Sequence, residues 1–221
     1  MRKPRVIKDY GPTALLLEWE PKIDLDISRS VHTYQRALIQ WPALIEVVPA
    51  YASLLVVTDP LQISLPELRE RLYDLQLTES GAHKEFTLHK LPVHYDGPDL
   101  HFVAEATGLT PAAVIEAHSA PTYHVYQLGF LPGFAFLGDL PPALRLPRRS
   151  SPRKSVPPGS VAIAGGQTAV YPSASPGGWH LVGVCPLSML TTNIEGSRPR
   201  LSPGDQVKFH PISADHFARI H

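Results

Sequence analysis

Residues 123–184 read YHVYQLGFLPGFAFLGDLPPALRLPRRSSPRKSVPPGSVAIAGGQTAVYPSASPGGWHLVGV, and their alternation of short strands and tight turns indicates the architecture. Apolar runs such as Tyr123–Leu128 and Ser160–Ala164 are separated by turns rich in glycine and proline. Strands at this spacing are typical of a closed antiparallel barrel, because a parallel sheet needs a long crossover between successive strands. The pattern therefore predicts a β-barrel.

The barrel pattern continues on both sides of these residues. Two short helices, Asp99–Thr107 and Pro111–His118, are expected upstream. Gly108 suits the end of the first helix, and Pro111 suits the first turn of the second. Further strands are expected at Phe86–Tyr95, Thr168–Tyr171, Trp179–Val184 and Gln206–Phe209. Residues 86–221 are therefore assigned to the barrel domain.

The first 85 residues carry a different pattern, in which apolar strands alternate with helices. Thr13–Glu18, Leu44–Val48 and Ser53–Thr58 are short apolar runs bounded by turn residues, and they predict strands. Ser64 and Glu67 have the spacing of a helix capping box, and leucines follow them at helical spacing. Residues 1–85 are therefore predicted to form a small α+β sandwich, which makes the chain an α+β protein of two domains.

Composition excludes several classes of protein. Hydrophobic residues make up 43% of the 221 residues and charged residues 18%, so a disordered or fibrous chain is excluded. With 24 prolines and 15 glycines, the chain turns too often to be mostly helical. Cys185 is the single cysteine and cannot form an internal disulfide, and the apolar run Ala14–Leu17 is too short for a signal peptide or a membrane span. A cytoplasmic protein is expected.

The net charge of zero hides an uneven distribution. Residues 1–139 carry 11 Lys/Arg and 17 Asp/Glu, whereas residues 140–194 carry five basic residues and no acid. The five are Arg145, Arg148, Arg149, Arg153 and Lys154. Such a segment suits an anionic ligand or an acidic partner surface, but a solvated loop balanced by the other domain would carry the same charges. We expect Arg148 and Arg149 to lack a carboxylate partner, because none is close in sequence.

Three kinds of site are excluded. The helix pair at 99–118 looks like a DNA-binding helix-turn-helix, yet no Lys or Arg lies between Lys90 and Arg145, so the pair could not contact phosphates. The eleven histidines contain no HxH or HExxH arrangement, so no metal site is expected. No Walker A loop, GxSxG motif or dinucleotide fingerprint is present, and Gly165-Gly166 is too short for a phosphate loop.

Glycines, prolines and aromatic residues are densest at 129–183. Gly129–Phe134 and Ser175–Trp179 form tight loops whose glycines expose backbone N–H groups, and the neighbouring arginines offer bidentate anion donors. Barrel turns with a basic rim would explain the glycines but not the arginines. His118 stands at the end of a helix, where a histidine more often caps the helix C-terminus than catalyses. The residues alone thus indicate a barrel with an anion-binding cleft.

The segment 129–183 resembles the signature of the 5-oxoprolinase B subunit family, also called the kinase-A inhibitor or allophanate hydrolase subunit 1 family. The resemblance extends to VHYDGPDL (93–100), EAHSAPTYHVYQLGF (116–130) and SPGDQVKF (202–209), and more weakly to GPTALLLEWEPKID (11–24) and VVPAYASLLVVTD (47–59). It therefore covers essentially the whole chain. Two positions depart from the family pattern: Phe136 replaces the usual tyrosine and removes a hydroxyl, and Ala169 replaces a common glycine.

The resemblance implies a fold and a function. The implied fold is a small α+β domain followed by a cyclophilin-like β-barrel. The implied function is that of the B subunit of an ATP-dependent 5-oxoprolinase, which opens 5-oxo-L-proline to L-glutamate together with the C subunit, its direct partner, and the A subunit. This chain is expected to be inactive alone, and ATP need not touch it. Two alternatives stay open: an inhibitor of a sensor histidine kinase, and one half of a biotin-dependent carboxyltransferase whose biotin arrives on another protein.

The resemblance also implies site residues. Those matched as catalytic are His118, Arg148 and Gln167. Those matched as substrate-binding are Tyr123, Gly129, Phe130, Pro132, Gly133, Arg149, Arg153, Tyr171, Gly177, Gly178 and Trp179. No metal ligand is implied.

Overall fold

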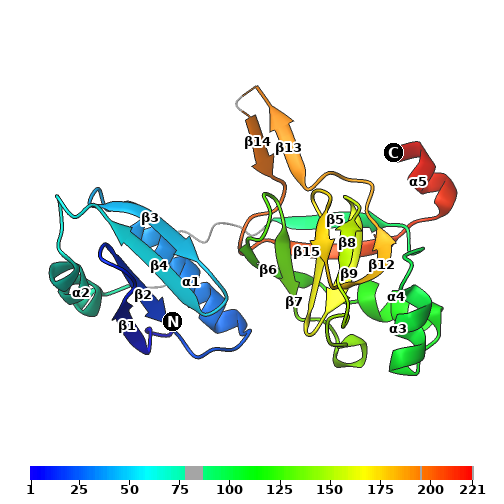
Figure 1. Ribbon diagram of the computed structural model, residues 1–221, viewed down its shortest axis with the longest axis horizontal. Coiled ribbons are helices and arrows are strands. Elements are labelled where there is room, and N and C mark those ends of the chain that lie inside the picture. The colour runs from blue at the N-terminus through cyan, green and yellow to red at the C-terminus, as the bar shows by residue number, and fades with distance from the viewer. Residues whose placement is uncertain (78–86, 195, 221) are drawn as a thin grey trace. The chain divides into compact units, whose positions relative to one another are not determined.

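In the computed structural model, which describes residues 1–77, 87–194 and 196–220, the chain forms two compact units, Met1–Glu85 and Phe86–His221 (Figure 1). The domain boundary expected from the sequence, between residues 85 and 86, lies outside the described residues. Each unit has its own hydrophobic core, as an independently folding domain requires.

The N-terminal unit is a four-stranded antiparallel sheet in the order β1-β2-β4-β3, packed with two helices. The strands are β1 (Val6–Asp9), β2 (Ala14–Glu18), β3 (Leu44–Pro49) and β4 (Ser53–Thr58). Its core joins Leu15, Leu17, Leu54 and Val56 of the sheet to Ile27 and Val31 of the first helix and Leu68 and Leu72 of the second. The predicted α+β sandwich is therefore the observed one.

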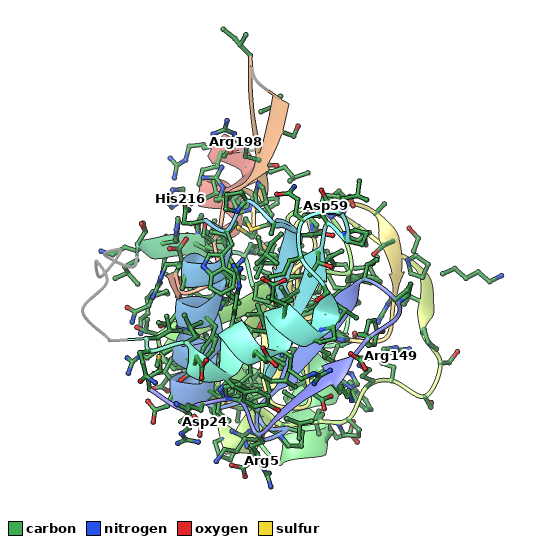
Figure 2. The ribbon with its side chains drawn as sticks, turned by 90° about the vertical axis from the view of Figure 1, so that its left-hand side faces the viewer. Arg5, Asp24, Asp59, Arg149, Arg198 and His216 are labelled. Atoms are coloured by element: carbon green, nitrogen blue, oxygen red, sulfur yellow. The ribbon has the colours of Figure 1, made fainter. Side chains whose placement is uncertain are left out.

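Side-chain caps define where both helices of this unit begin. The carboxylate of Asp24 accepts hydrogen bonds from the N–H groups at the start of α1 (Leu25–Leu38) (Figure 2). The hydroxyl of Ser64 accepts one from the N–H of Glu67 at the start of α2 (Leu65–Asp74), which is the cap expected from the sequence. Both caps satisfy donors that the first turn of a helix leaves without partners.

The second unit is built on a seven-stranded sheet in the order β12-β9-β10-β7-β6-β15-β5. The strands are β5 (Leu88–Val93), β6 (Tyr123–Leu128), β7 (Ala135–Gly138), β9 (Ser160–Ala164), β10 (Gln167–Val170), β12 (His180–Val184) and β15 (Gln206–Pro211). Just after β5, His94 exchanges backbone hydrogen bonds of 2.9 and 2.8 Å with Val184 and so joins the two ends of the sheet. The sheet therefore closes into a barrel, which confirms the predicted fold class.

One strand pair departs from the antiparallel pattern that the sequence predicts. β5 and β15 lie parallel, with Leu88 opposite Gln206 and Val93 opposite Pro211. A parallel pair needs a long connection, and here the connection contains the rest of the barrel. Short turns between most strands therefore do not exclude one parallel pair formed by the two ends of the domain.

Two small strand pairs accompany the barrel. β8 (Arg153–Val156) pairs with β11 (Ser175–Gly177), and β13 (Leu190–Asn193) pairs with β14 (Gly196–Pro199) in a hairpin that projects from the barrel in Figure 1. No strand is predicted at these segments, at β7 or at β1, because each has only three or four residues, too few to show a periodic pattern.

The helices of the second unit are α3 (Leu100–Thr107), α4 (Pro111–Ser119), α5 (Ala214–Ile220) and a 3₁₀ turn, η1 (Pro142–Leu144). The backbone of Gly108, at φ +69°, ends α3 in the left-handed conformation that favours glycine. The hydroxyl of Thr110 accepts a 3.2 Å hydrogen bond from the N–H of Ala113 and begins α4. Both predicted helices are confirmed to within one residue.

The barrel sheet buries both of its faces, and this determines where the candidate site residues lie. Along β9, Val161 and Ile163 belong to the main core, which includes residues of α3 and α4. Ala162 and Ala164 belong instead to a second cluster. Since successive residues of a strand point to opposite faces, the sheet separates the two clusters.

Candidate functional site

An aromatic cluster, made of Phe134, Phe136, Tyr171 and Trp179, covers the second face of the barrel sheet. The Phe134 ring lies 4.8 Å from that of Phe136, 5.2 Å from that of Tyr171 and 5.9 Å from that of Trp179, measured between centroids. The strand residues of this cluster are mostly alanines, Ala162, Ala164 and Ala169, whose small side chains leave room for the rings. The cluster therefore joins two predicted substrate-binding residues, Tyr171 and Trp179, to the loop at 129–134.

That loop holds an exposed aromatic side chain in an unusual backbone conformation. Phe130 has φ +71° and is 63% exposed, and its ring packs edge-on against that of Phe134 at 5.4 Å. A non-glycine residue in the left-handed region is uncommon, and residues held in strained conformations cluster at active sites and ligand-binding positions. Gly133, at φ +80°, has no room for a side chain, since a Cβ there would lie 2.8 Å from the Cδ2 of Leu190. Together with Gly129 and Pro132, these residues present the Phe130 ring to solvent.

The glycines of the turn at 176–179 allow close packing against the aromatic cluster. A Cβ on Gly177 would collide with the hydroxyl oxygen of Tyr171 and lie 3.0 Å from a methyl of Val156. The carbonyl of Gly178 accepts a 2.8 Å hydrogen bond from the N–H of Arg149. Both glycines thus bring the turn into contact with the predicted binding residues.

Arg149 and Arg153 share a carboxylate partner, so the expectation that Arg149 is unpaired is wrong. Asp99, immediately before α3, accepts hydrogen bonds at one carboxylate oxygen, Oδ1, from Arg149 at 3.0 Å and from Arg153 at 2.7 Å (Arg149 is labelled in Figure 2). Its Oδ2 accepts one from the N–H of Leu181 at 2.7 Å. The acid lies 50 residues before Arg149, outside the acid-free segment that suggested unpaired charges.

Arg148 remains the exposed cation of this group. Its side chain forms no hydrogen bond or ion pair with any residue of the described parts of the chain. Burial raises the pKa of the Tyr171 hydroxyl, and the positive charges of Arg148 and Arg153 oppose that rise, so both guanidinium groups lie within electrostatic reach of Tyr171. Three positive charges against one carboxylate leave this region able to attract an anion.

His118 lies on the other face of the sheet and does not cap α4, so that expectation is wrong. Its side chain is fully buried, with Nδ1 2.7 Å from the hydroxyl of Tyr95 and Nε2 2.9 Å from that of Thr168. Because Thr168 donates its proton to the carbonyl of Ala162, the ring donates from Nε2 and accepts at Nδ1. The imidazole is therefore a neutral core group.

The sheet separates the predicted residues into two sets. Tyr123 lies with His118, fully buried, and its hydroxyl donates a 2.7 Å hydrogen bond to the carbonyl of His118. Gln167 begins β10 and is half-buried; it shares a face with Ala169, whereas Thr168 points toward His118. The structure thus brings the arginines next to Tyr171 and the turn at 176–179, which contact the aromatic cluster, and places His118 and Tyr123 behind the sheet.

Acid should destabilise the barrel through His118. Burial lowers the pKa of its imidazole from 6.5 to about 3 in the folded state. Between those values the unfolded chain binds a proton that the folded chain excludes, so the free energy of unfolding falls as the pH drops below 6.5, by about 1.4 kcal/mol per pH unit at most. We expect a loss of about 2 kcal/mol between pH 7 and pH 5.

Urea denaturation at the two pH values can measure this loss. Trp179 reports on the barrel when Trp19 and Trp41 of the N-terminal unit are replaced by phenylalanine. His118→Gln should remove most of the pH dependence between 7 and 5, and an unchanged slope in that variant would assign the dependence to another group.

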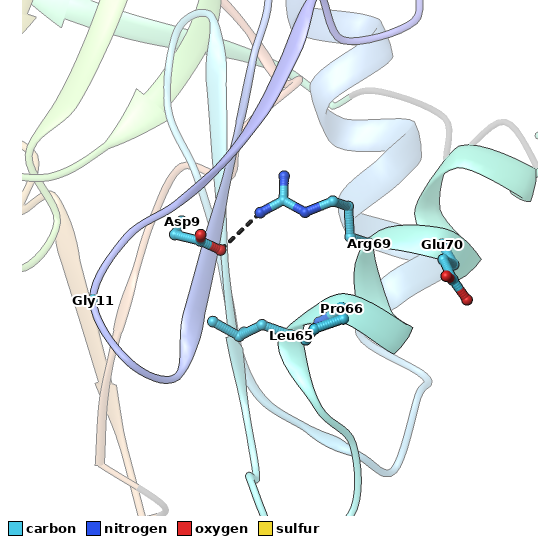
Figure 3. Close-up of a pocket in the computed structure, with 6 residues that line it drawn as sticks. All are labelled: Asp9, Gly11, Leu65, Pro66, Arg69 and Glu70. Carbon is cyan, nitrogen blue, oxygen red and sulfur yellow. Dashed lines mark hydrogen bonds and ion pairs between the residues drawn. The ribbon is translucent and has the colours of Figure 1, made fainter.

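A cavity of about 490 Å³ lies in the N-terminal unit, between the start of α2 and the end of β1 (Figure 3). Arg69 at its wall is already paired: its guanidinium donates to the carbonyl of Ile7 and, at 2.7 Å, to the carboxylate of Asp9. Its other lining residues are Gly11, Leu65, Pro66 and Glu70. The cavity contains none of the residues that the sequence analysis assigned to a site.

Neither a metal centre nor a membrane span is found in residues 1–77, 87–194 and 196–220. Within these described residues no group of three or more His, Cys, Asp or Glu side chains is placed to hold a metal ion. Nor is any helix there both long enough and apolar enough to cross a lipid bilayer.

Sequence reasoning missed Asp99 as part of the site. The acid-free segment drew attention to the arginines, but pairing across 50 residues depends on α3 lying beside β12. A usable signal was present: VHYDGPDL (93–100), within which Asp99 lies, is one of the segments in which the family resemblance is found.

Comparison with known proteins identifies the family. The family model described as "Carboxyltransferase domain, subdomain C and D" matches residues 5–198. The chain is 39% identical to the 5-oxoprolinase B subunit of Escherichia coli O157:H7, over 91% of this chain and 93% of that protein, and 39% identical to the 5-oxoprolinase B subunit of Bacillus subtilis (strain 168), over 94% and 92%.

A solved structure has a similar fold. The crystal structure of TTHA0988 matches with a TM-score of 0.81 at 37% identity, over 91% of this chain and 40% of that one, so this chain spans two fifths of the length of TTHA0988. The chain therefore belongs to the carboxyltransferase subdomain C and D family, together with the 5-oxoprolinase B subunits.

Proposed function

We propose that this chain is the B subunit of an ATP-dependent 5-oxoprolinase that opens 5-oxo-L-proline to L-glutamate together with the C and A subunits. The observation that carries the proposal is the 39% identity to two proteins named as the B subunit of 5-oxoprolinase, along nearly their whole length. Matches of that extent leave no large region of the chain free for an unrelated activity.

Three arginines, Arg148, Arg149 and Arg153, carry charges that suit this substrate. Opening the ring requires attack on an amide carbonyl, which develops negative charge on the carbonyl oxygen, and 5-oxoproline itself carries a carboxylate. Arg148, Arg149 and Arg153 supply positive charge beside the Tyr171 hydroxyl and the glycine turn. Guanidinium groups suit such oxygens because their donors form a planar fork.

ATP is proposed to bind to the partner subunits rather than to this chain. Gly165-Gly166 joins β9 to β10 and does not lead into a helix, so it does not form the phosphate loop of a nucleotide site. The Arg145 guanidinium beside Gly166 donates to the carbonyl of Leu140. The chain is therefore proposed to supply substrate-binding groups and to be inactive alone.

Reconstitution tests the proposal. ATP hydrolysis is measured with and without 5-oxo-L-proline for the purified chain, for the chain with the C subunit, and for the chain with both the C and A subunits. Strong stimulation by 5-oxoproline is expected only in the full mixture. If 5-oxoproline does not stimulate ATP hydrolysis in the full mixture, the proposed function is wrong. If it strongly stimulates ATP hydrolysis by the chain alone, the proposal that the chain is inactive without its partners is wrong.

The family description favours one second candidate, a half of a biotin-dependent carboxyltransferase. This candidate requires transfer of a carboxyl group from a biotinylated carrier to an acceptor. When a carboxylated carrier of this kind is added to the chain and the C subunit, the carboxyl group should stay on the carrier if the oxoprolinase proposal holds. The kinase-inhibitor alternative stays a prediction without a structural observation in its favour.

A further inference from the structure

The carboxylate of Asp99 ties together three parts of the barrel unit. Asp99 is 4% exposed and stands at the start of α3. It accepts hydrogen bonds from Arg149 and from Arg153 at the start of β8, and from the N–H of Leu181 in β12. Burial alone would raise the pKa of this carboxyl, but the bonds from Arg153 and Leu181 and the charges of both arginines hold it below its usual value, so the group is ionised at neutral pH.

The two arginines that Asp99 holds are also in contact with the candidate site. The backbone N–H of Arg149 binds the carbonyl of Gly178, and Arg153 lies opposite Gly177 in the β8–β11 pair. Gly177 in turn packs against the Tyr171 hydroxyl. The arginine side chains nevertheless stay partly accessible, at 33% for Arg149 and 22% for Arg153.

We infer that Asp99 is a positioning residue, which holds Arg149 and Arg153 in one orientation so that their outer edges, together with Arg148, bind an anionic oxygen group of the substrate. The ligand class is a carboxylate or a phosphorylated oxygen, and the inference rests on the proposed function. Each guanidinium binds Asp99 through one nitrogen, Nη1 of Arg149 and Nη2 of Arg153, and one further nitrogen of each is buried, so the donors left for a ligand are Nη2 of Arg149 and Nε of Arg153. Pre-ordering these long side chains lowers the entropy that binding would otherwise cost.

The cluster is not arranged for stability alone. Nε of Arg149 and Nη1 of Arg153 are buried and have no hydrogen-bond partner among the described residues. Leaving a buried charged donor unsatisfied is costly, and a pair serving only the fold would be expected to satisfy it. Buried donors without a partner are uncommon in folded proteins, and a role in holding the arginines for a ligand accounts for these two.

Replacing Asp99 separates positioning from charge. Asp99→Asn removes one negative charge, so an effect of charge alone would tighten anion binding and lower the KM for 5-oxoproline. Loss of positioning predicts the opposite, a KM raised tenfold or more in the reconstituted complex with a smaller change in kcat. Asp99→Glu keeps the charge and should recover part of the loss. A KM that is unchanged or lower in Asp99→Asn would overturn the inference.

Asp205→Asn is the matched control. Asp205 is a second buried carboxylate of the same unit, 6% exposed, and it binds His89 and the N–H groups of Thr87 and Ser202 rather than an arginine. It should lower thermal stability and leave the KM unchanged. If both variants raise the KM equally, the effect of Asp99 is only structural.

Two further measurements make the test independent of stability and of the reaction. In an Arg149→Gln/Arg153→Gln background, Asp99→Asn should raise the KM by less than threefold, because both residues through which it acts are already gone. Inorganic phosphate titrated into the isolated chain should shift the NMR signals of the arginine side chains in the wild type and not in Asp99→Asn. Absence of a shift in the wild type would overturn the inference even if the complex hydrolyses 5-oxoproline. A wild-type shift without oxoprolinase activity would overturn only the proposed function.

Discussion

Alanine in place of His118 should lower the free energy of unfolding of the barrel unit by about 3–5 kcal/mol, the cost of truncating a large buried ring. The ring is fully buried and stacks on Phe209 at 4.8 Å, so its removal leaves a cavity. It also leaves the Tyr95 hydroxyl without its acceptor and removes the N–H that donates to the Thr168 hydroxyl oxygen. Urea denaturation at pH 7, followed by Trp179 fluorescence, measures the loss.

His101→Ala is the control for this change. His101 lies on α3 with an exposed side chain, so the same truncation should cost less than about 0.5 kcal/mol. If His118→Ala is as mild as the control and instead abolishes activity, the histidine reaches the reacting atoms in the assembled enzyme, and its buried position in the free chain is not the functional one.

Lysine in place of Arg148 should lower kcat/KM of the reconstituted complex about tenfold or more. The change keeps the positive charge but loses the planar fork of donors. Loss of one hydrogen bond to a charged group costs about 1.5–3 kcal/mol, and about 1.4 kcal/mol corresponds to a tenfold change in rate. Arg148 is the appropriate test because Asp99 binds the other two arginines, so only at Arg148 does a substitution spare the ion pairs of the fold. Thermal stability should barely change.

Arg36→Lys in the N-terminal unit is the matched control. Arg36 is an exposed arginine on α1, and its guanidinium donates to the Thr33 hydroxyl. Steady-state assays should show activity within twofold of wild type for this variant. The same result for Arg148→Lys would remove Arg148 from the site and leave the basic segment as a solvated rim.

Local patterns predicted most of the fold. Turn chemistry and hydrophobic period placed the strands that have continuous apolar runs, and the caps at Ser64 and Gly108 placed helix ends, because these features depend on neighbours in the chain. The parallel pairing of β5 with β15 was missed, and so were the short strands β1, β7, β8, β11, β13 and β14, since distant pairing and strands of three or four residues leave no local periodicity.

The candidate site was predicted less completely, for a related reason. The glycines and arginines are visible in the local composition, whereas Asp99 acquires its role only when α3 meets β12. His118 was misread because its position at a helix end suggested a cap, while its role depends on Thr168, 50 residues further along. The face of the sheet on which a side chain lies depends on how the whole barrel folds, so neighbouring residues in the sequence do not reveal it.

The closure of the barrel has a consequence for the synthesis of the protein. The strand that begins the second unit, β5, finds its neighbour β15 only near the end of the chain, and Thr87 and Asp205, which flank that pair, are separated by 118 positions. Contacts this distant in sequence slow folding, because a long loop must be ordered before they form. On the ribosome the N-terminal unit can fold as soon as it emerges, whereas the barrel must wait with open edges until residues 206–211 are released. A chain that terminates early would therefore carry a folded first unit followed by unpaired strands, the form that aggregates and that chaperones hold.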